Sequence, residues 1–175
     1  MNSWYDIKSL APGGGEDERG MLESSSRISS LIGQEVDNGI PAERIIVGGF
    51  SQGAVIALLT GLSSERKLAG IVSLSGYLGL AEKMGSMKSE RAHLLPIFWG
   101  HGTADPVVRY SWGKESRDKL KSLGFNKLEF HSYAGEYCSL LLGALASSAV
   151  LWLSFHTQGW DIACATMRKG IWLHF

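Results

Sequence analysis

Apolar residues at helical spacing alternate with short hydrophobic runs over most of the chain. Between Met21 and Val36 the apolar positions recur near the helical period, after an acidic first turn and before an Asn-Gly-Ile-Pro stop, which predicts a helix over residues 18–38. Three of the short runs are hydrophobic throughout, as buried parallel strands are, and a fourth alternates. The predicted strands cover residues 44–48, 68–74, 94–99 and 127–133.

Two more helices fit between these strands. One follows Ser51, over residues 54–61, with a glycine stop at Gly61, and the other covers residues 109–123. The segment at residues 79–91 is charged and irregular, which indicates surface. Because helix and strand alternate, we expect an α/β fold of the doubly wound type, with a mostly parallel sheet.

The character of the chain changes after residue 135. Residues 137–160 contain no Asp, Glu, Lys or Arg, and residues 140–155 predict a buried helix or a marginal membrane span, short against the roughly 20 residues that a span needs. Residues 161–175 show no clear period and suggest no role. We therefore divide the chain into a partial α/β domain, residues 1–135, and a divergent apolar tail, residues 136–175.

Composition excludes several kinds of partner. The 17 Lys and Arg are balanced by 17 Asp and Glu without a basic block, which argues against nucleic acid and leaves membrane contact peripheral at most. Two cysteines, Cys138 and Cys164, form neither a disulfide framework nor a metal site. The first residues resemble no secretory signal. We expect a cytoplasmic protein without a bound metal.

The most informative stretch is Ile-Ile-Val-Gly-Gly-Phe-Ser-Gln-Gly, residues 45–53. A β-branched run that enters glycines around a serine is typical of a strand, a sharp turn and a helix, which makes Ser51 the candidate nucleophile. A side chain at Gly49 or Gly53 would crowd such a strained turn. The alternative is an ordinary strand-to-helix turn.

A serine nucleophile needs a histidine base and a carboxylate that orients it. Asp105 suits the carboxylate role, because it follows the predicted strand that ends at Trp99, and the active sites of open α/β sheets lie beyond the carboxyl ends of their strands. Its position after Ser51 also fits the chain order Ser, Asp, His. The alternative is a turn aspartate before a proline.

Four motifs carry a resemblance to a known family: Ser-Trp-Tyr-Asp, Gly-Phe-Ser-Gln-Gly-Ala, Ser-Leu-Ser-Gly-Tyr-Leu and Pro-Ile-Phe-Trp-Gly-His-Gly-Thr-Ala-Asp-Pro-Val-Val. Over about residues 1–135 the chain resembles the acyl-protein thioesterase and lysophospholipase family of α/β-hydrolases. The resemblance implies that Ser51 is the nucleophile, Asp105 the triad acid and the backbone N–H of Gln52 one oxyanion donor.

The resemblance also implies substrates. Family members hydrolyse palmitoyl thioesters on S-acylated proteins and acyl esters of lysophospholipids without a cofactor. For this chain we expect a cytoplasmic location, with the nucleus as a second compartment. Tyr77, Leu78 and Trp99 would then line an acyl pocket, although aromatic residues after strands are more often core.

The chain departs from the family at two places. Members begin with further strands and a His-Gly-type loop that supplies the second oxyanion donor, so we expect a sheet that is incomplete on its N-terminal side, with an uncovered edge. Where the family has Met-Gly-His-Ser, this chain has Glu136-Tyr137-Cys138-Ser139. Cys138 therefore stands at the position of the base, and a thiol cannot both accept from serine and donate to Asp105 as an imidazole does.

The five histidines of the chain are the possible substitutes for that base. We interpret His101 and His131 as packing or surface residues and His93 as solvent-exposed, while His156 and His174 lie in the tail. The sequence thus favours a serine hydrolase of the thioesterase type that is impaired because its base is missing. The alternatives are a catalytically inactive relative that binds acyl chains or a protein partner, and the product of an aberrant transcript.

Overall fold

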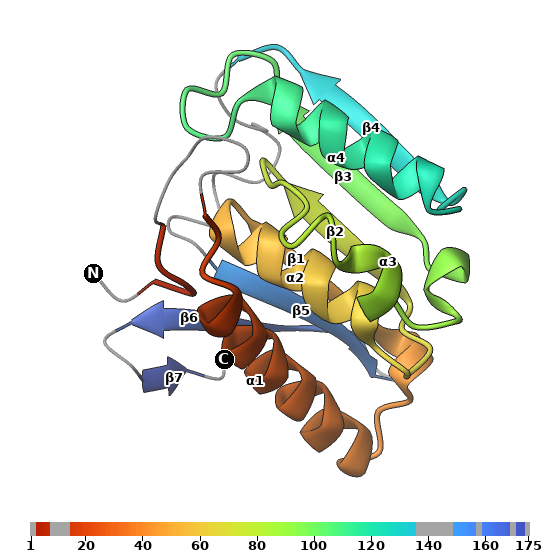
Figure 1. The fold of residues 1–175 in the computed structure, drawn as a ribbon. Helices are drawn as coiled ribbons and strands as arrows, with labels where there is room; N and C mark the ends of the chain where they lie inside the picture. Colours follow the sequence, from red (N-terminus) through yellow and green to blue (C-terminus); the bar gives the residue numbers. More distant parts are fainter. Residues whose placement is uncertain (1–2, 8–14, 136–148, 157–158, 169–170, 174–175) are drawn as a thin grey trace.

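The computed structural model describes residues 3–7, 15–135, 149–156, 159–168 and 171–173 (Figure 1). Strand order in the sheet is β4-β3-β2-β1-β5-β6-β7. The first four are parallel, which confirms the α/β prediction of a mostly parallel sheet. They are β1 (Ile45–Phe50), β2 (Gly70–Leu74), β3 (Ile97–Gly102) and β4 (Leu128–Tyr133).

Helix α1 (Glu18–Asp37) agrees with the predicted helix to within one residue. The Asp17 side chain caps its start by accepting from the backbone N–H of Gly20. Its apolar stripe buries Met21, Ile28 and Ile32. A short 3-10 turn, η1 (Ala42–Arg44), then leads into β1.

Helix α2 (Gln52–Ser63) follows β1 and is apolar on all sides, with ten consecutive buried residues. The predicted glycine stop at Gly61 is wrong, because the helix continues for two more residues. Gly61 instead serves packing: a Cβ there would lie 2.5 Å from Cδ1 of Ile71 in β2. Because Gly61 has only a hydrogen atom in place of a side chain, α2 can approach the sheet closely.

The segment between β2 and β3 contains α3 (Met84–Met87) and the 3-10 turn η2 (Ala92–Leu94). The prediction that residues 79–91 are surface is wrong in part, since Leu80 and Met84 belong to the main core. The apolar residues of this segment are few and are interspersed with charged ones, so the sequence pattern did not reveal that some of them are buried. Helix α4 (Tyr110–Ser122) then joins β3 to β4 and ends before Gly124, whose φ of +92° favours glycine.

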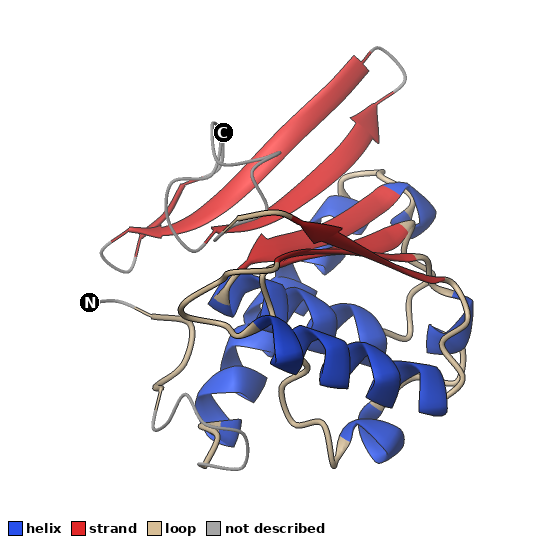
Figure 2. Ribbon diagram, turned by 90° about the horizontal axis from the view of Figure 1, so that it is seen from above, coloured by secondary structure: helices blue, strands red, loops and turns tan. Residues whose placement is uncertain are grey.

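The two faces of the parallel strands differ in their cover. One face, with Val47, Ile71 and Trp99, shares a large core with residues of α1, α2 and α4. The connections from β1 to β4 all move in one direction across the sheet, so right-handed crossovers place their helices on the same face, as Figure 2 shows for the strands and helices. The other face carries a smaller cluster around Leu74 that includes no residue of a described helix.

The remaining strands are β5 (Ala149–His156), β6 (Gly159–Arg168) and β7 (Ile171–Leu173), paired antiparallel in sequence. Strand β5 also pairs antiparallel with β1. The prediction of a helix or membrane span at residues 140–155 is therefore wrong for residues 149–155, and residues 140–148 lie outside the described part.

The pairing also corrects the expectation of an uncovered edge at β1. The backbone N–H and C=O groups on that side of β1 need partners, and β5 supplies them from Ile45 to Gly49. Among the helices that the structure describes, none is long and apolar enough to cross a membrane.

Candidate active site

Ser51 occupies the turn between β1 and α2 with φ 54° and ψ −121°, a conformation that a residue with a side chain rarely adopts. Its backbone N–H donates to the carbonyl of Leu74 at 2.9 Å, which ties the turn to the end of β2. The side chain is partly exposed, and within the described residues its hydroxyl has no hydrogen-bond partner. The predicted nucleophile is thus held in a strained turn.

The turn requires a glycine at position 49. A Cβ on Gly49 would overlap the carbonyl group of Gly53 and lie 2.6 Å from the backbone nitrogen of Ala54. These are backbone atoms of the first turn of α2, which cannot rotate away as a side chain could. Gly49 and Gly53 are therefore in contact across the elbow, where the sequence predicts crowding.

Gln52 is the first residue of α2, so its backbone N–H has no partner inside the helix and lies at the positive end of the helix dipole. The side chain of Gln52 makes contacts that the sequence did not reveal. Its Nε2 donates to the Tyr5 carbonyl at 3.1 Å, and its Oε1 accepts from the Trp4 N–H at 3.4 Å. No local pattern signals a contact across 47 residues.

Asp105 lies in the loop after β3 and is 7% exposed. Its Oδ1 accepts from the backbone N–H groups of Val107 and Val108, each at 3.0 Å. These bonds fold residues 105–108 into a tight turn and fix the carboxylate. Oδ2 lies 3.9 Å from Nε2 of His101 and makes no shorter polar contact that the structure records.

Ser51 and Asp105 lie at the same edge of the sheet, beyond the ends of β1 and β3. Phe50, Leu74 and Gly100 are in register across β1, β2 and β3. With β2 between them, the ends of β1 and β3 are about 10 Å apart, twice the spacing of neighbouring strands. The two side chains therefore need a third group between them to act together.

His101 does not supply that group. It is fully buried in β3, and its Nε2–H donates to the Val108 carbonyl at 2.8 Å. Nδ1 has no hydrogen-bond partner among the described residues and faces Gly113 of α4. Burial lowers the pKa of His101 below its ordinary value, against the opposing effects of the Val108 bond and the Asp105 charge. A neutral ring with its proton on Nε2 fits this position.

Two of the other histidines have described side chains, and both lie at the surface. His131 is exposed on β4, where it stacks on Phe98, and His93 is exposed with Nδ1 2.8 Å from the Glu90 carbonyl oxygen. For His156 only the backbone, in β5, is described. His174 and Cys138, the residue at the expected position of the base, lie outside the described residues.

The residues considered for an acyl pocket belong to the core. Trp99 and Leu78 are buried in the main cluster, and Tyr77 packs against it. The Tyr77 hydroxyl lies 2.9 Å from that of Tyr5, and burial raises the pKa of both phenols. Both stay protonated at neutral pH, so neither can replace a histidine as base.

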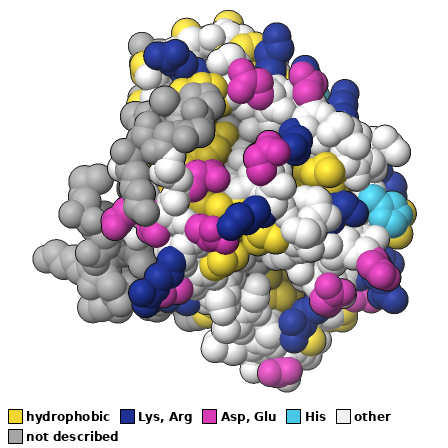
Figure 3. All heavy atoms as spheres, viewed as in Figure 1, with side chains coloured by type: hydrophobic (Ala, Val, Ile, Leu, Met, Phe, Trp, Pro, Cys, Tyr) yellow, Lys and Arg dark blue, Asp and Glu magenta, His cyan; other side chains and the backbone are white. Residues whose placement is uncertain are grey.

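On the face that Figure 3 shows, Lys and Arg are interspersed with Asp and Glu, without a patch of one sign. In the described part of the chain, no three side chains of His, Cys, Asp or Glu gather as metal ligands would.

Comparison with known proteins places this geometry in a family. The model of the Phospholipase/Carboxylesterase family matches residues 1–147, past the limit at residue 135 that the sequence predicts for the resemblance. The chain belongs to this family.

Relatives within the Phospholipase/Carboxylesterase family include acyl-protein thioesterases. Acyl-protein thioesterase 1 of Yarrowia lipolytica is 46% identical over 137 residues, covering 77% of this chain and 60% of the relative. The protein of the same name from Cryptococcus neoformans is 50% identical over 123 residues, covering 69% and 52%. The chain thus spans only about half to three fifths of the length of these relatives.

Solved structures agree with the fold. Arabidopsis thaliana SOBER1 superimposes with a TM-score of 0.73 at 32% identity, over 77% of this chain and 65% of that one. Zea mays acyl-protein thioesterase 2 gives 0.65 at 30% identity, over 76% and 63%. This likeness confirms the α/β-hydrolase type of the sheet.

Proposed function

We propose that this chain is a serine hydrolase of the thioesterase type whose activity is impaired for lack of a histidine base, since none of the histidine side chains that the structure describes is placed to act as one. The observation that carries the proposal is the conformation of Ser51. A non-glycine residue with φ 54° at the end of a central strand, facing the first turn of a helix, is the arrangement of a nucleophile elbow.

The proposed chemistry assigns a role to each site residue. Ser51 Oγ attacks the acyl carbonyl, and the Gln52 backbone N–H stabilises the oxyanion of the tetrahedral intermediate. In an intact enzyme a histidine takes the Ser51 proton and passes it to the departing alcohol or thiol, and without that base water would have to carry the proton. Asp105 would orient and stabilise the protonated base with Oδ2, since Oδ1 is already occupied by Val107 and Val108. Release of the alcohol or thiol leaves an acyl-enzyme that water hydrolyses.

The names of the relatives support the substrate class. The relatives named acyl-protein thioesterase 1 support an acyl thioester on a protein as the substrate. From the family resemblance we further propose a palmitoyl or other long-chain acyl group, with acyl esters of lysophospholipids as a second substrate class. The mixed surface charge supports such a substrate over nucleic acid, with peripheral contact to a membrane at most. We propose the cytoplasm as its location, with the nucleus as a second compartment.

The expected rate of hydrolysis follows from the proposed lack of a histidine base. Triad members act as a unit, so a chain without its histidine should turn over about 10⁴ to 10⁶ times more slowly than an intact enzyme. The test compares hydrolysis of a p-nitrophenyl ester by the purified, folded chain and by its Ser51→Ala variant. A rate that depends on Ser51 supports the proposal, and equal rates would remove the enzyme function.

A second candidate function is that of an inactive relative, which binds acyl chains or a protein partner at the same site. The observation in its favour is that His101 is buried and already hydrogen-bonded to Val108. A fluorophosphonate probe separates the two candidates when the folded chain is compared with its Ser51→Ala variant, since even slow labelling that depends on Ser51 requires a serine that retains some activation. Folded protein that stays unlabelled at Ser51 would favour the inactive form.

A further inference from the structure

The side chain of Gln52 joins the elbow to a segment far away in the sequence. Both ends of its amide are used, one as donor to the Tyr5 carbonyl and one as acceptor from the Trp4 N–H. Trp4 and Tyr5 are themselves buried, at 3% and 4% exposure. We refer to these two residues as the Trp4/Tyr5 pair. Their backbone atoms thus contact the side chain of the first residue of α2.

The Trp4/Tyr5 pair is anchored independently of Gln52. The Ser24 hydroxyl of α1 donates to the Trp4 carbonyl, and the Tyr5 hydroxyl shares a hydrogen bond with Tyr77 in the segment after β2. The Asp6 N–H donates to Asp17, the cap of α1. These contacts make the pair a fixed support on which the Gln52 side chain rests.

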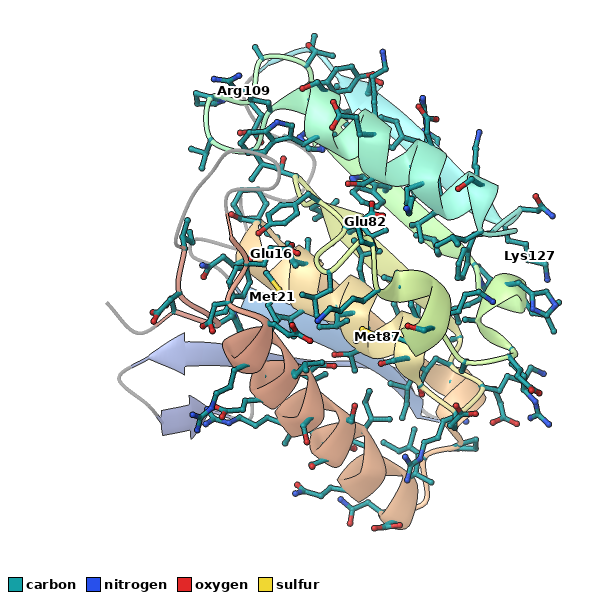
Figure 4. The ribbon with its side chains drawn as sticks, viewed as in Figure 1. Glu16, Met21, Glu82, Met87, Arg109 and Lys127 are labelled. Carbon is teal, nitrogen blue, oxygen red and sulfur yellow. The ribbon has the colours of Figure 1, made fainter. Side chains whose placement is uncertain are left out.

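A third connection joins the residues before α1 to the segment that follows β2. The Glu16 carboxylate, labelled in Figure 4 beside the start of α1, accepts from the Leu80 N–H with both oxygens at 3.1 Å. Leu80 has φ 53°, an unfavourable backbone conformation that such contacts stabilise. The residues before α1 therefore bind both the elbow and the segment that follows the neighbouring strand.

We infer that the Gln52 side chain is a positioning element for its own backbone N–H, with the Trp4/Tyr5 pair as its support. Residue 52 follows a strained residue and begins a helix, so its backbone N–H lacks the intrahelical bond that would fix its direction. A side chain held at two points restricts rotation of that residue. The inference rests on the proposed function, in which this N–H stabilises the oxyanion.

Two variants of the full chain test the inference. Gln52→Met keeps the length of the side chain and removes both polar atoms, whereas Gln52→Glu keeps an acceptor for Trp4 and loses the donor to Tyr5. Ser30→Ala is the matched control, because it removes an exposed side-chain hydrogen bond within α1, to the Ser26 carbonyl. The backbone ¹⁵N order parameter of residue 52 is measured for each, together with the hydrolysis of a p-nitrophenyl ester.

We expect the order parameter of residue 52 to fall from about 0.85 toward 0.6 in Gln52→Met, with a smaller fall in Gln52→Glu and none in Ser30→Ala. A misdirected oxyanion donor should lower kcat by about tenfold or more and leave KM unchanged. A rigid residue 52 beside a loosened Trp4/Tyr5 pair would overturn the inference, since the side chain would then only hold the pair in place.

The two readouts also separate this inference from the proposed function. If the unmodified chain hydrolyses no ester above the Ser51→Ala background, the proposed function fails, and the order parameter still decides whether Gln52 holds its own N–H. If Gln52→Met does not fold, Gln52→Glu is judged by the same criterion. An unchanged order parameter in that variant contradicts the inference.

Discussion

Replacing Gly49 by alanine tests the geometry of the elbow most directly. The added methyl group would overlap the Gly53 carbonyl and approach the Ala54 nitrogen to 2.6 Å. Overpacking in a well-packed interior typically costs about 1 to 3 kcal/mol. Because the obstacle is the backbone of α2 and not a flexible side chain, we expect Gly49→Ala to lie at the upper end, about 3 kcal/mol.

Urea unfolding measures this cost. With a slope of about 2 kcal/mol per molar urea, a loss of about 3 kcal/mol lowers the midpoint by about 1.5 M. Gly33→Ala is the matched control: Gly33 lies inside α1, and the nearest atom to an added Cβ is a terminal nitrogen of Arg66 at 3.6 Å. That change should stabilise the protein by about 0.5 to 1 kcal/mol, as alanine replaces glycine in a helix.

The contrast between the two glycines decides the result. A Gly49→Ala midpoint equal to that of the unmodified chain would show that the first turn of α2 can move away from β1. The strained conformation of Ser51 would then not be imposed by the packing at Gly49, and the structural argument for a nucleophile elbow would lose its basis.

Three further predictions concern the loop of Asp105 and the residues behind it. Burial lowers the pKa of His101 in the folded state, so below about pH 6.5 the unfolded chain binds more protons at this residue. The free energy of unfolding should therefore fall as pH decreases from about 7 to 5, which urea midpoints across this range measure. If the same pH dependence persists in His101→Gln, other groups cause it. Gly113→Ala should destabilise the protein by about 1 to 3 kcal/mol, because the new Cβ would lie 2.9 Å from Cε1 of the buried His101 ring. Thermal unfolding measures this loss against the control Gly85→Ala, in which the nearest atom to the new Cβ is Leu123 Cδ2 at 3.6 Å. Asp105→Asn keeps an oxygen for the Val107 and Val108 N–H groups, whereas Asp105→Ala leaves the buried Val108 N–H unpaired. We expect the alanine variant to be about 1 to 3 kcal/mol less stable than the asparagine variant in urea unfolding. Equal stabilities of the two variants would contradict the role of Oδ1.

The elements that could be predicted from the sequence are those whose signals are local. The run of Ile45, Ile46 and Val47 into Gly48 and Gly49 marks both a buried strand and its sharp end, and β1 and the elbow follow it. Hydrophobic periodicity likewise located α1 and α4 to within about one residue of their observed ends. In each case the residues that give the signal also make the structure.

Predictions failed where the cause lies in another element. Gly61 carries the sequence signal of a helix stop, yet its position is determined by Ile71 of β2, which no local pattern reveals. The Gln52 contacts with Trp4 and Tyr5 likewise depend on how two distant segments meet. The strand at Ala149–His156 depends on the open edge of β1, since the sequence of the segment alone also suits a buried helix.

The individual residues of the candidate site could be predicted from the sequence, but whether they form a complete set of catalytic groups could not. Ser51, Gln52 and Asp105 follow strands whose carboxyl ends meet at one edge, and their roles remain predictions from the resemblance. For His101 the sequence left a packing and a surface position open, and the structure shows the packing position, with Nε2 hydrogen-bonded to the Val108 carbonyl. Its fully buried place in β3 results from packing against Gly113 of α4.

Two main-chain hydrogen bonds hold the serine of the elbow and the neighbouring strand end. The Ser51 N–H donates to Leu74, and the Ser75 N–H, from a second residue with positive φ, donates to Gly100 at 2.8 Å. Neither bond involves a side chain, so the shape of the turn does not depend on which reactive group it carries. A thiol at position 51 would stand where the hydroxyl stands, whereas a β-branched residue would clash with its own backbone. The fold therefore separates the presentation of a nucleophile from its chemistry, and the same scaffold can carry oxygen or sulfur.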